Sequence, residues 1–239
     1  MKLLLAIDTA TDIGSVAIGT PGETAVQLPI EKRMHAALLI PRINDALERS
    51  GYSYGDLTGI IVANGPGSFT GLRIGFSTAM GILLQHPGLE LLTAPSLMAA
   101  AYSARDVVSG PVAALYDALR GDVFGAVYDF SGRSVRVRLP PTLGPVSLLE
   151  ELCDEAPRAA VGDGAILFQR QVEDWTGAAP LAPPEFGPWA GAFLELYGND
   201  GAIRPIEDPS QFEPDYGRLA EAQVRMEMAL EAPKQTENC

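Results

Sequence analysis

Cysteine and histidine are scarce in this sequence. Its 239 residues include two cysteines, Cys153 and Cys239, and two histidines, His35 and His86. Two such thiols do not make a disulfide framework, so a reducing compartment fits. The histidines form no H-E-x-x-H pattern and the cysteines no C-x-x-C pattern, so the sequence predicts no metal site.

Basic residues are also few. The chain has 17 Lys and Arg against 30 Asp and Glu, a net charge of −13 at pH 7 and an isoelectric point near 4.5. Because phosphate backbones and anionic lipids both require clustered Lys and Arg, this surface is not expected to hold nucleic acid or a membrane by itself. A partner would have to supply the basic surface for an RNA.

The N-terminal apolar run, Leu3-Leu4-Leu5-Ala6-Ile7, ends at Asp8. It is too short for a signal peptide or a membrane-spanning helix, so we interpret it as a buried strand and expect a cytoplasmic protein. Apolar residues still make up 47% of the chain, which is enough for a substantial core.

Strand and helix patterns alternate along the first half. Two apolar runs around a polar turn predict a hairpin, and apolar residues at helical spacing follow. The mixture is typical of an α/β fold with a mixed sheet. The predicted elements are strands at 3–7, 15–19, 59–63 and 91–94 and helices at 35–49, 74–84 and 97–105.

The second half opens like the first. Apolar runs at 112–116 and 123–128 flank an Asp-led turn at 117–122. This repeats the start of the chain in pattern and predicts a duplicated domain. Further helices are expected at 147–154, 189–196 and 218–230.

A glycine-rich loop follows the strand at 59–63 and leads into a helix, where free N–H groups and the helix dipole favour anions. The Gly-Lys-Ser/Thr ending of a P-loop is missing, and Gly65-x-Gly67-x-x-x-Gly71 is one residue too long for a dinucleotide fingerprint. A structural turn is favoured over a nucleotide site. The same holds for Asp8-Thr9-Ala10-Thr11, because Asp and Thr are common in hairpin turns.

Small residues form a stripe on the helix after this loop: Gly71, Gly75 and Ala79 recur every four residues. Since glycine costs roughly 1 kcal/mol in a helix interior, the stripe requires a compensating contact. Either the sheet of the same chain or the helix of a partner would supply it.

These motifs together resemble a known family. Residues 4–11 are similar to the opening of the TsaB (YeaZ) proteins, and residues 65–75 resemble their most distinctive segment. His35 with residues 38–41 resembles their first-helix motif. The stretches 95–97, 117–124 and 213–218 resemble later ones. The similarity is strong over about residues 3–130 and weak over 131–210.

The resemblance implies an actin-like, Hsp70-like ATPase fold of the ASKHA, ribonuclease H-like type, with two duplicated domains of mixed sheets flanked by helices. We therefore expect an N-terminal domain over residues 1–108 and a smaller C-terminal domain over 109–211. A helix at about 212–230 would pack back on the first domain, and residues 231–239 would form a flexible tail.

The resemblance also implies a non-catalytic subunit in the formation of N6-threonylcarbamoyladenosine in tRNAs that read ANN codons. Such a subunit binds and activates its catalytic paralogue, TsaD, works with the ATPase TsaE and forms a homodimer when alone. We expect tRNA contact only through the complex, and no membrane. The expected partner interface consists of His35, Leu38, Leu39, Ile43, Leu72, Arg73, Gly75, Phe76, Ala79 and Leu83.

ATP-binding relatives typically carry Asp-x-Gly-Thr in the first turn, where this chain has Ala10. A Cβ there restricts the backbone and the approach of a phosphate. We expect no catalytic residue, no metal and no independently bound cofactor, and leave open ATP or ADP at the junction with the partner. A vestigial nucleotide loop would consist of Asp8, Thr9, Thr11, Gly65, Gly67 and Ser68.

An alternative is an ATP-dependent kinase or carbamoyl transferase of the same fold that acts on its own. It would need Asp8, Asp117 and the glycine-rich loop to hold Mg-ATP. A metallopeptidase is a third hypothesis, which the missing His and Cys ligand pattern disfavours.

Overall fold

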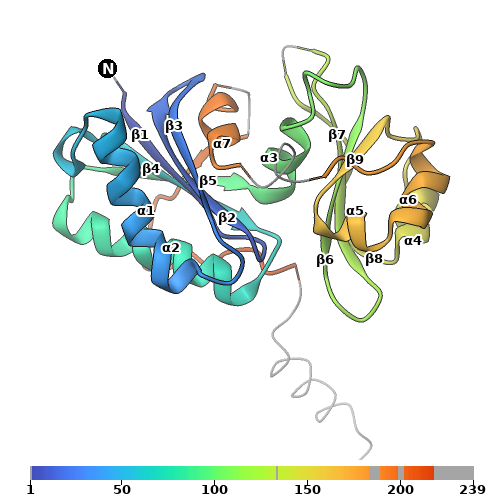
Figure 1. Cartoon of the computed structure of the whole chain (residues 1–239), viewed down its shortest axis with the longest axis horizontal. Coiled ribbons are helices and arrows are strands. Elements are labelled where there is room, and N and C mark those ends of the chain that lie inside the picture. The colour runs from blue at the N-terminus through green and yellow to red at the C-terminus, as the bar shows by residue number, and fades with distance from the viewer. Residues whose placement is uncertain (1, 133, 183–188, 199–201, 218–239) are drawn as a thin grey trace, which may run out of the picture.

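The structure is a computed structural model that describes residues 2–132, 134–182, 189–198 and 202–217 (Figure 1). Two β-sheets with helices packed on them make up the chain. The elements in chain order are β1 (Leu4–Asp8), β2 (Gly14–Thr20), β3 (Glu23–Ile30), α1 (His35–Ser50), β4 (Gly59–Gly65), α2 (Phe69–Gln85), β5 (Glu90–Pro95), α3 (Ser96–Tyr102), β6 (Val112–Asp117), β7 (Val123–Asp129), β8 (Arg136–Gly144), α4 (Val146–Leu152), β9 (Ala159–Val161), α5 (Asp163–Leu167), α6 (Gln169–Thr176), α7 (Gly191–Glu195) and β10 (Arg204–Pro205), with a short 3-10 helix, η1 (Tyr54–Asp56), before β4.

The first sheet has the strand order β10-β5-β4-β1-β2-β3. β1, β2 and β3 are antiparallel neighbours, whereas β4 and β5 run parallel to β1. Successive side chains of β1 alternate between the two faces. Leu5 and Ile7 join a core with α1 and α2 on the outer face, and Leu4 and Ala6 join a core with α3 and α7 on the inner face.

The second sheet has the order β8-β7-β6-β9, with β6 to β8 antiparallel and β9 parallel to β6. This repeats the order β3-β2-β1-β4 of the first sheet. Its inner face, with Tyr116 and Tyr128, packs toward α3, and its outer face, with Leu115 and Val127, packs under α4 and α6. The repeat confirms the predicted α/β fold of two mixed sheets flanked by helices.

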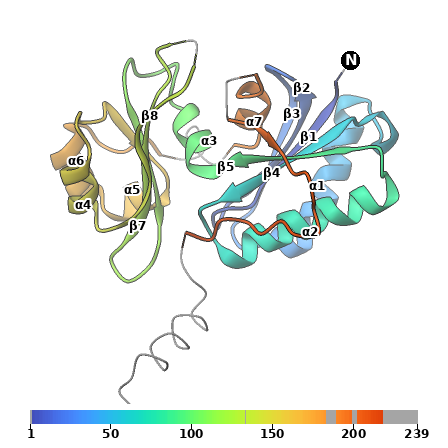
Figure 2. The same cartoon turned by 180° about the vertical axis from the view of Figure 1, so that it is seen from behind.

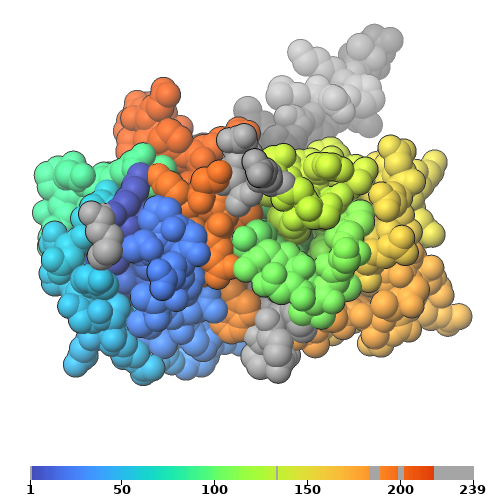
Figure 3. Space-filling model, turned by 90° about the horizontal axis from the view of Figure 1, so that it is seen from above, coloured from blue at the N-terminus to red at the C-terminus, as the bar shows by residue number. Residues whose placement is uncertain are grey.

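The chain returns to the first sheet earlier than the predicted boundary at residue 211. α7 packs on β2 and β3, and β10 pairs with β5. The amide of Ala190 donates to the hydroxyl of Ser15 (2.7 Å), and Phe193 and Leu194 are fully buried. α7 therefore completes the apolar inner face of the first sheet, and Figure 3 shows orange atoms of this returning segment beside the blue N-terminal strands.

Residues 206–217, here named the strap, follow β10 and lie along α2 (Figure 2). Of the predicted helix at 212–230, residues 212–217 are described and are not helical. They instead bond to the loop after β4, where the amide of Asp215 donates to the carbonyl of Asn64 (2.8 Å). The rest of that predicted helix, and the predicted tail at 231–239, lie outside the described residues.

α2 begins at Phe69, earlier than the predicted start at residue 74. Ser68 caps it, because its hydroxyl accepts a hydrogen bond from the amide of Gly71 (3.2 Å). The glycine-rich loop is therefore short, and its last glycine already lies in the helix.

Candidate functional site

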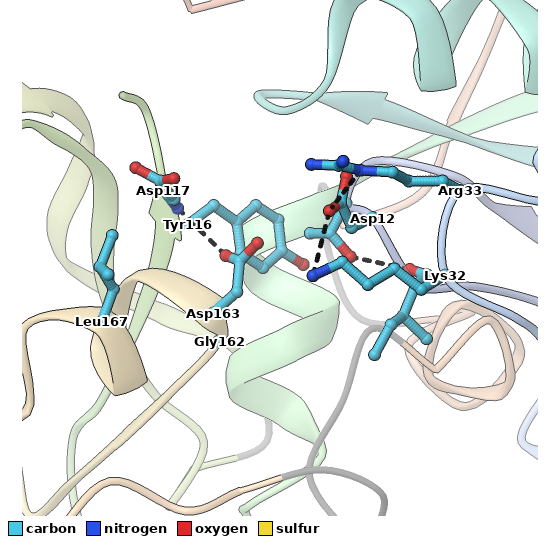
Figure 4. A pocket seen from close by; sticks show the side chains of 10 residues that line it. Asp12, Lys32, Arg33, Tyr116, Asp117, Gly162, Asp163 and Leu167 are labelled. Carbon is cyan, nitrogen blue, oxygen red and sulfur yellow. Dashed lines mark hydrogen bonds and ion pairs between the residues drawn. The ribbon is translucent and has the colours of Figure 1, made fainter. Parts of the chain in front are cut away.

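The turn between β1 and β2 in the first half and the turn between β6 and β7 in the second half face each other across a cleft. Two adjoining cavities of about 320 and 680 Å³ occupy it, and both are lined by Thr11 and Asp12 of the first turn and by Tyr116 and Asp117 of the second half. Figure 4 shows Asp12 with Lys32 and Arg33 on one side and Tyr116, Asp117 and Asp163 on the other. This cleft is the candidate functional site.

Asp8 ends β1 at the base of the first turn and is fully buried. One carboxylate oxygen accepts a hydrogen bond from the amide of Ala10 (3.0 Å), and the other is buried without a hydrogen-bond partner. Burial raises the pKa of Asp8 to about 6, against the opposing effect of the Ala10 amide. Asp8 lies behind the first turn and lines neither cavity.

The glycine-rich loop packs directly on the first turn. The amide of Ser68 donates to the carbonyl of Ala10 (2.6 Å). A Cβ at Gly67 would overlap that same carbonyl, and a Cβ at Gly71 would overlap the carbonyl of Thr9. The structure thus brings together the predicted vestigial loop, which consists of Asp8, Thr9, Thr11, Gly65, Gly67 and Ser68.

Several backbone donors around the cleft are already bonded within the chain. In the first half, the amides of Ala10, Ser68 and Gly71 bond to the chain itself. In the second half, one oxygen of Asp163 accepts from the amides of Asp117 (3.0 Å) and Gly164 (2.9 Å). These amides are the groups that would otherwise bind phosphate oxygens.

The β6–β7 turn carries two consecutive residues with left-handed backbone, Leu119 (φ 62°) and Arg120 (φ 58°). For residues other than glycine this conformation costs about 1–2 kcal/mol each. The amide of Leu119 bonds to the side chain of Asp117 (2.8 Å), which helps to hold the turn. Such backbone strain collects at functional sites, and sequence reasoning had not singled out Leu119 or Arg120.

Charges of both signs line the cleft. Asp12 forms ion pairs with Lys32 (3.5 Å) and Arg33 (3.1 Å). Burial raises the pKa of Asp163, although the amides of Asp117 and Gly164 oppose that rise. Within the part of the chain that the structure describes, no group of three or more His, Cys, Asp or Glu residues could hold a metal ion.

Several residues of the predicted partner interface face this chain's own core, and the interface itself stays a prediction. The side chains that repeat at helical spacing in α1 face the sheet, and the small stripe of α2 packs on the first turn, where a Cβ at Gly75 would overlap the Thr9 hydroxyl. The amphipathic pattern that marked these residues reflects this chain's own core. Six of the predicted interface residues are buried: His35, Leu39, Ile43, Leu72, Gly75 and Ala79.

The remaining predicted interface residues do reach the surface. Leu38, Phe76 and Leu83 are half-buried and Arg73 is exposed. Sequence reasoning missed neighbours that are more exposed, among them Met34 (42%), Ile40 (45%) and Phe69 (40%). They were detectable as large apolar residues that lie off the core-facing stripe of each helix.

His35 has a structural position. Its Nε2 lies 2.8 Å from the carbonyl oxygen of Thr11, and because a carbonyl only accepts, Nε2 carries the proton. Its Nδ1 is buried without a hydrogen-bond partner. His35 thus fixes the first turn against α1.

Two linked sheets with the same order of strands, each opening with an antiparallel hairpin, and a cleft between the hairpin turns define an actin-like, Hsp70-like ATPase fold of the ASKHA type. A family model described as TsaD, tRNA N6-adenosine threonylcarbamoyltransferase, matches residues 29–153. The chain belongs to this family, on its TsaB (YeaZ) branch.

The relatives place the chain on that branch. The tRNA threonylcarbamoyladenosine biosynthesis protein TsaB of Escherichia coli K12 is 37% identical over 126 residues, which is 52% of this chain and 54% of that protein. The chain therefore matches about half the length of this relative. The TsaB protein of Bacillus subtilis 168 is 27% identical over 231 residues, which is 93% of this chain and 96% of that protein.

Solved structures agree on the fold. YeaZ from Pseudomonas aeruginosa superposes with a TM-score of 0.65 at 25% identity, over 83% of this chain and 91% of that one. A second solved structure, described as an uncharacterized protein with similarity to peptidase YeaZ from Pseudomonas aeruginosa, gives a TM-score of 0.72 at 23% identity, over 91% of this chain and all of the other. Among the described residues, no helix is long and apolar enough to cross a membrane.

Proposed function

We propose that this chain is a non-catalytic subunit in the formation of N6-threonylcarbamoyladenosine in tRNAs that read ANN codons. In this proposal it binds and activates a TsaD-like catalytic paralogue, works with a TsaE-like ATPase and forms a homodimer when alone. tRNA reaches it only through the complex.

The state of the cleft carries this proposal. The amides of Ala10, Ser68, Gly71 and Gly164 are bonded to the chain's own oxygens, as described above. An independent phosphate site needs such donors free and pointing at the ligand. A cleft of this kind is suited to a subunit whose fold is kept for assembly.

The outer face of α1 and α2 supports a partner there. Ile40 is 45% exposed and Phe69 40%, and Leu38 is half-buried against the core under α1 and α2. Exposed apolar side chains on adjacent helices are the usual material of a helix-to-helix interface. We therefore propose that the partner binds to α1 and α2 through the exposed residues of the two helices.

A nucleotide at the junction with the partner is part of the proposal. The larger cavity has Arg33 and Arg120 on its walls and Phe69 and Tyr216 among its other lining residues, which offers both charge and ring surface. Because the amides named above are engaged within the chain, the partner would supply phosphate donors. ATP or ADP would then bind only to the assembled pair.

Reconstitution tests the function. Threonylcarbamoyl transfer to tRNA is measured with the purified paralogue and ATPase, with and without this chain. We expect Ile40→Asp to lower the rate and the affinity for the paralogue about tenfold or more, as central interface positions do. Val137→Asp on β8 is the matched control, because Val137 is 52% exposed on the other half and should change neither.

Asp8→Asn separates an accessory role from a catalytic one. In the accessory role the complex with Asp8→Asn keeps the wild-type rate, because the side chain does no chemistry. Full transfer without this chain, or equal loss from Ile40→Asp and Val137→Asp, would contradict the proposal.

The unpartnered carboxylate oxygen of Asp8 is the one observation that favours an ATP-dependent enzyme acting alone. Titration of the isolated chain with Mg-ATP by calorimetry decides the matter. Micromolar binding that Asp8→Ala abolishes would support the enzyme. Absence of heat, together with normal transfer by the Asp8→Asn complex, would support the subunit.

A further inference from the structure

The strap joins three parts of the molecule. It leaves the first sheet where the amide of Ile206 donates to the carbonyl of Leu91 (2.9 Å). It then crosses α2, with Phe212 against Phe76 at a centroid distance of 5.0 Å. Figure 2 shows it beside this helix up to the loop after β4. The strap thus covers part of α2 and ends beside the cleft.

Its last described residues fix one side chain of α2. The ring of Tyr216 lies against Phe69 at a centroid distance of 4.5 Å. The guanidinium carbon of Arg73 lies 4.0 Å from the centroid of Phe69 and 5.6 Å from that of Tyr216. Arg73 Nε donates to the hydroxyl of Tyr216 (3.1 Å). Two rings and one hydrogen bond therefore set the plane of the guanidinium.

Arg73 has no carboxylate partner among the residues that the structure describes, although the chain is strongly acidic. It is the only charged residue in the sequence of α2. Nε is engaged by Tyr216, which leaves the two Nη groups as the fork that binds a carboxylate with two parallel hydrogen bonds. A guanidinium held in one plane loses less side-chain entropy when it forms such a pair.

We propose that the strap completes the partner surface of this chain by holding Arg73 as the anchor for a carboxylate of the partner protein. Tyr216 and Phe69 are positioning residues that act through Arg73. Arg and aromatic residues packed together are the usual composition of the residues that dominate binding energy at protein interfaces. This inference rests on the proposed function, since the partner is the TsaD-like paralogue.

A protein carboxylate is favoured over an RNA phosphate as the anion. RNA binding draws on several clustered cations, and α2 supplies one. Arg33, which lines the nearby cleft, is already paired with Asp12 (3.1 Å). The flat rings beside Arg73 are suited to a desolvated contact with one acidic side chain, where such a pair is strongest.

Calorimetric titration of the full-length chain with the purified paralogue, at low and high salt, tests this anchor. We expect Arg73→Gln to weaken binding about tenfold and to reduce its salt dependence. Arg73→Lys should lose about threefold, because lysine keeps the charge but not the planar fork. Tyr216→Phe keeps the ring and loses only the hydroxyl, and should weaken binding by a smaller factor of about two to three. Arg170→Gln on α6, an exposed arginine of the other half, is the matched control and should bind as wild type.

The outcomes separate the two proposals. No binding of the wild-type chain to the paralogue would refute the proposed partner itself. Wild-type affinity in Arg73→Gln would refute only the anchor. Unchanged affinity for the paralogue, with weaker tRNA binding by the Arg73→Gln complex, would assign the anion to RNA and would also overturn the inference. Thermal melting of each variant alone shows whether folding is retained, and Tyr216→Phe tests the anchor even if Arg73→Gln melts early.

Discussion

Gly71→Ala is expected to destabilise this protein although alanine is the better helix former. Gly71 lies in the first turn of α2, where a Cβ would approach the carbonyl oxygen of Thr9 well inside the 3.0 Å that real Cβ atoms respect. That oxygen belongs to the backbone of the turn between β1 and β2, so it cannot rotate away as a side chain could. The helix and the turn would have to separate.

The magnitude follows from two opposing effects. Overpacking of a tight contact costs about 1–3 kcal/mol, and a backbone obstacle places this case at the upper end. Alanine has a higher helix propensity than glycine, which offsets about 1 kcal/mol of that cost. The net loss is about 2 kcal/mol, which for a chain of this size lowers the melting temperature by roughly 4–8 °C.

Gly81→Ala is the matched control in the same helix. No atom lies within 4 Å of a Cβ at Gly81, so the propensity gain of about 1 kcal/mol or less should appear alone. Urea unfolding followed by far-ultraviolet circular dichroism measures both variants. If the two variants gain stability equally, the small-residue stripe does not pack on the first turn and the packing account is wrong.

Three further outcomes are expected. Asp8→Asn should stabilise the chain at pH 7 by up to about 3 kcal/mol, because the folded pKa of Asp8 is about 6, above the ordinary 3.8, so that ionisation of the buried carboxyl costs stability as pH rises from about 4 to 6. Urea unfolding midpoints at pH 4 and pH 7 test this, and an equal gain at both pH values would contradict it. Asp129→Asn should cost about 1 kcal/mol of unfolding free energy at pH 7 and little at pH 2. Hydrogen bonds from Ser131 and Arg138 lower the pKa of Asp129 to about 2, so the stability that the ionised carboxylate contributes is lost as pH falls from about 4 to 2. A cost that does not vary with pH would refute this. Ser68→Ala should cost about 1 kcal/mol of stability, because it removes the N-terminal cap of α2, whereas Ser68→Asp should retain most of that stability. Thermal melts compare the two variants, and a Ser68→Asp variant as unstable as Ser68→Ala would exclude the capping role.

Local patterns in the sequence were enough for much of the fold. Apolar runs around Asp-led turns predicted both hairpins, because strand alternation and turn chemistry are properties of a few neighbouring residues. The glycine-rich loop was predicted beside a strand and a helix, and it lies there. The repeat of these patterns at residues 112–128 predicted the duplication.

Long-range contacts could not be predicted in the same way. The stripe of Gly71, Gly75 and Ala79 has the same appearance whether it packs on its own sheet or on a partner. In this chain the two glycines lie against Thr9, and Ala79 belongs to the outer-face core. The burial of Leu39 and Ile43 depends on where the first sheet lies. The ring contacts of Arg73 come from Tyr216, which is far along the chain.

The return of α7 and β10 to the first sheet has a consequence for synthesis. The first sheet is built from both ends of the described chain, and the second sheet is inserted between them. On a ribosome that adds 5–20 residues per second, residues 112–190 require on the order of ten seconds, during which the inner face of the first sheet awaits α7. The second sheet draws all its strands from residues 112–161, so the half that comes later in the sequence is the one that can close first.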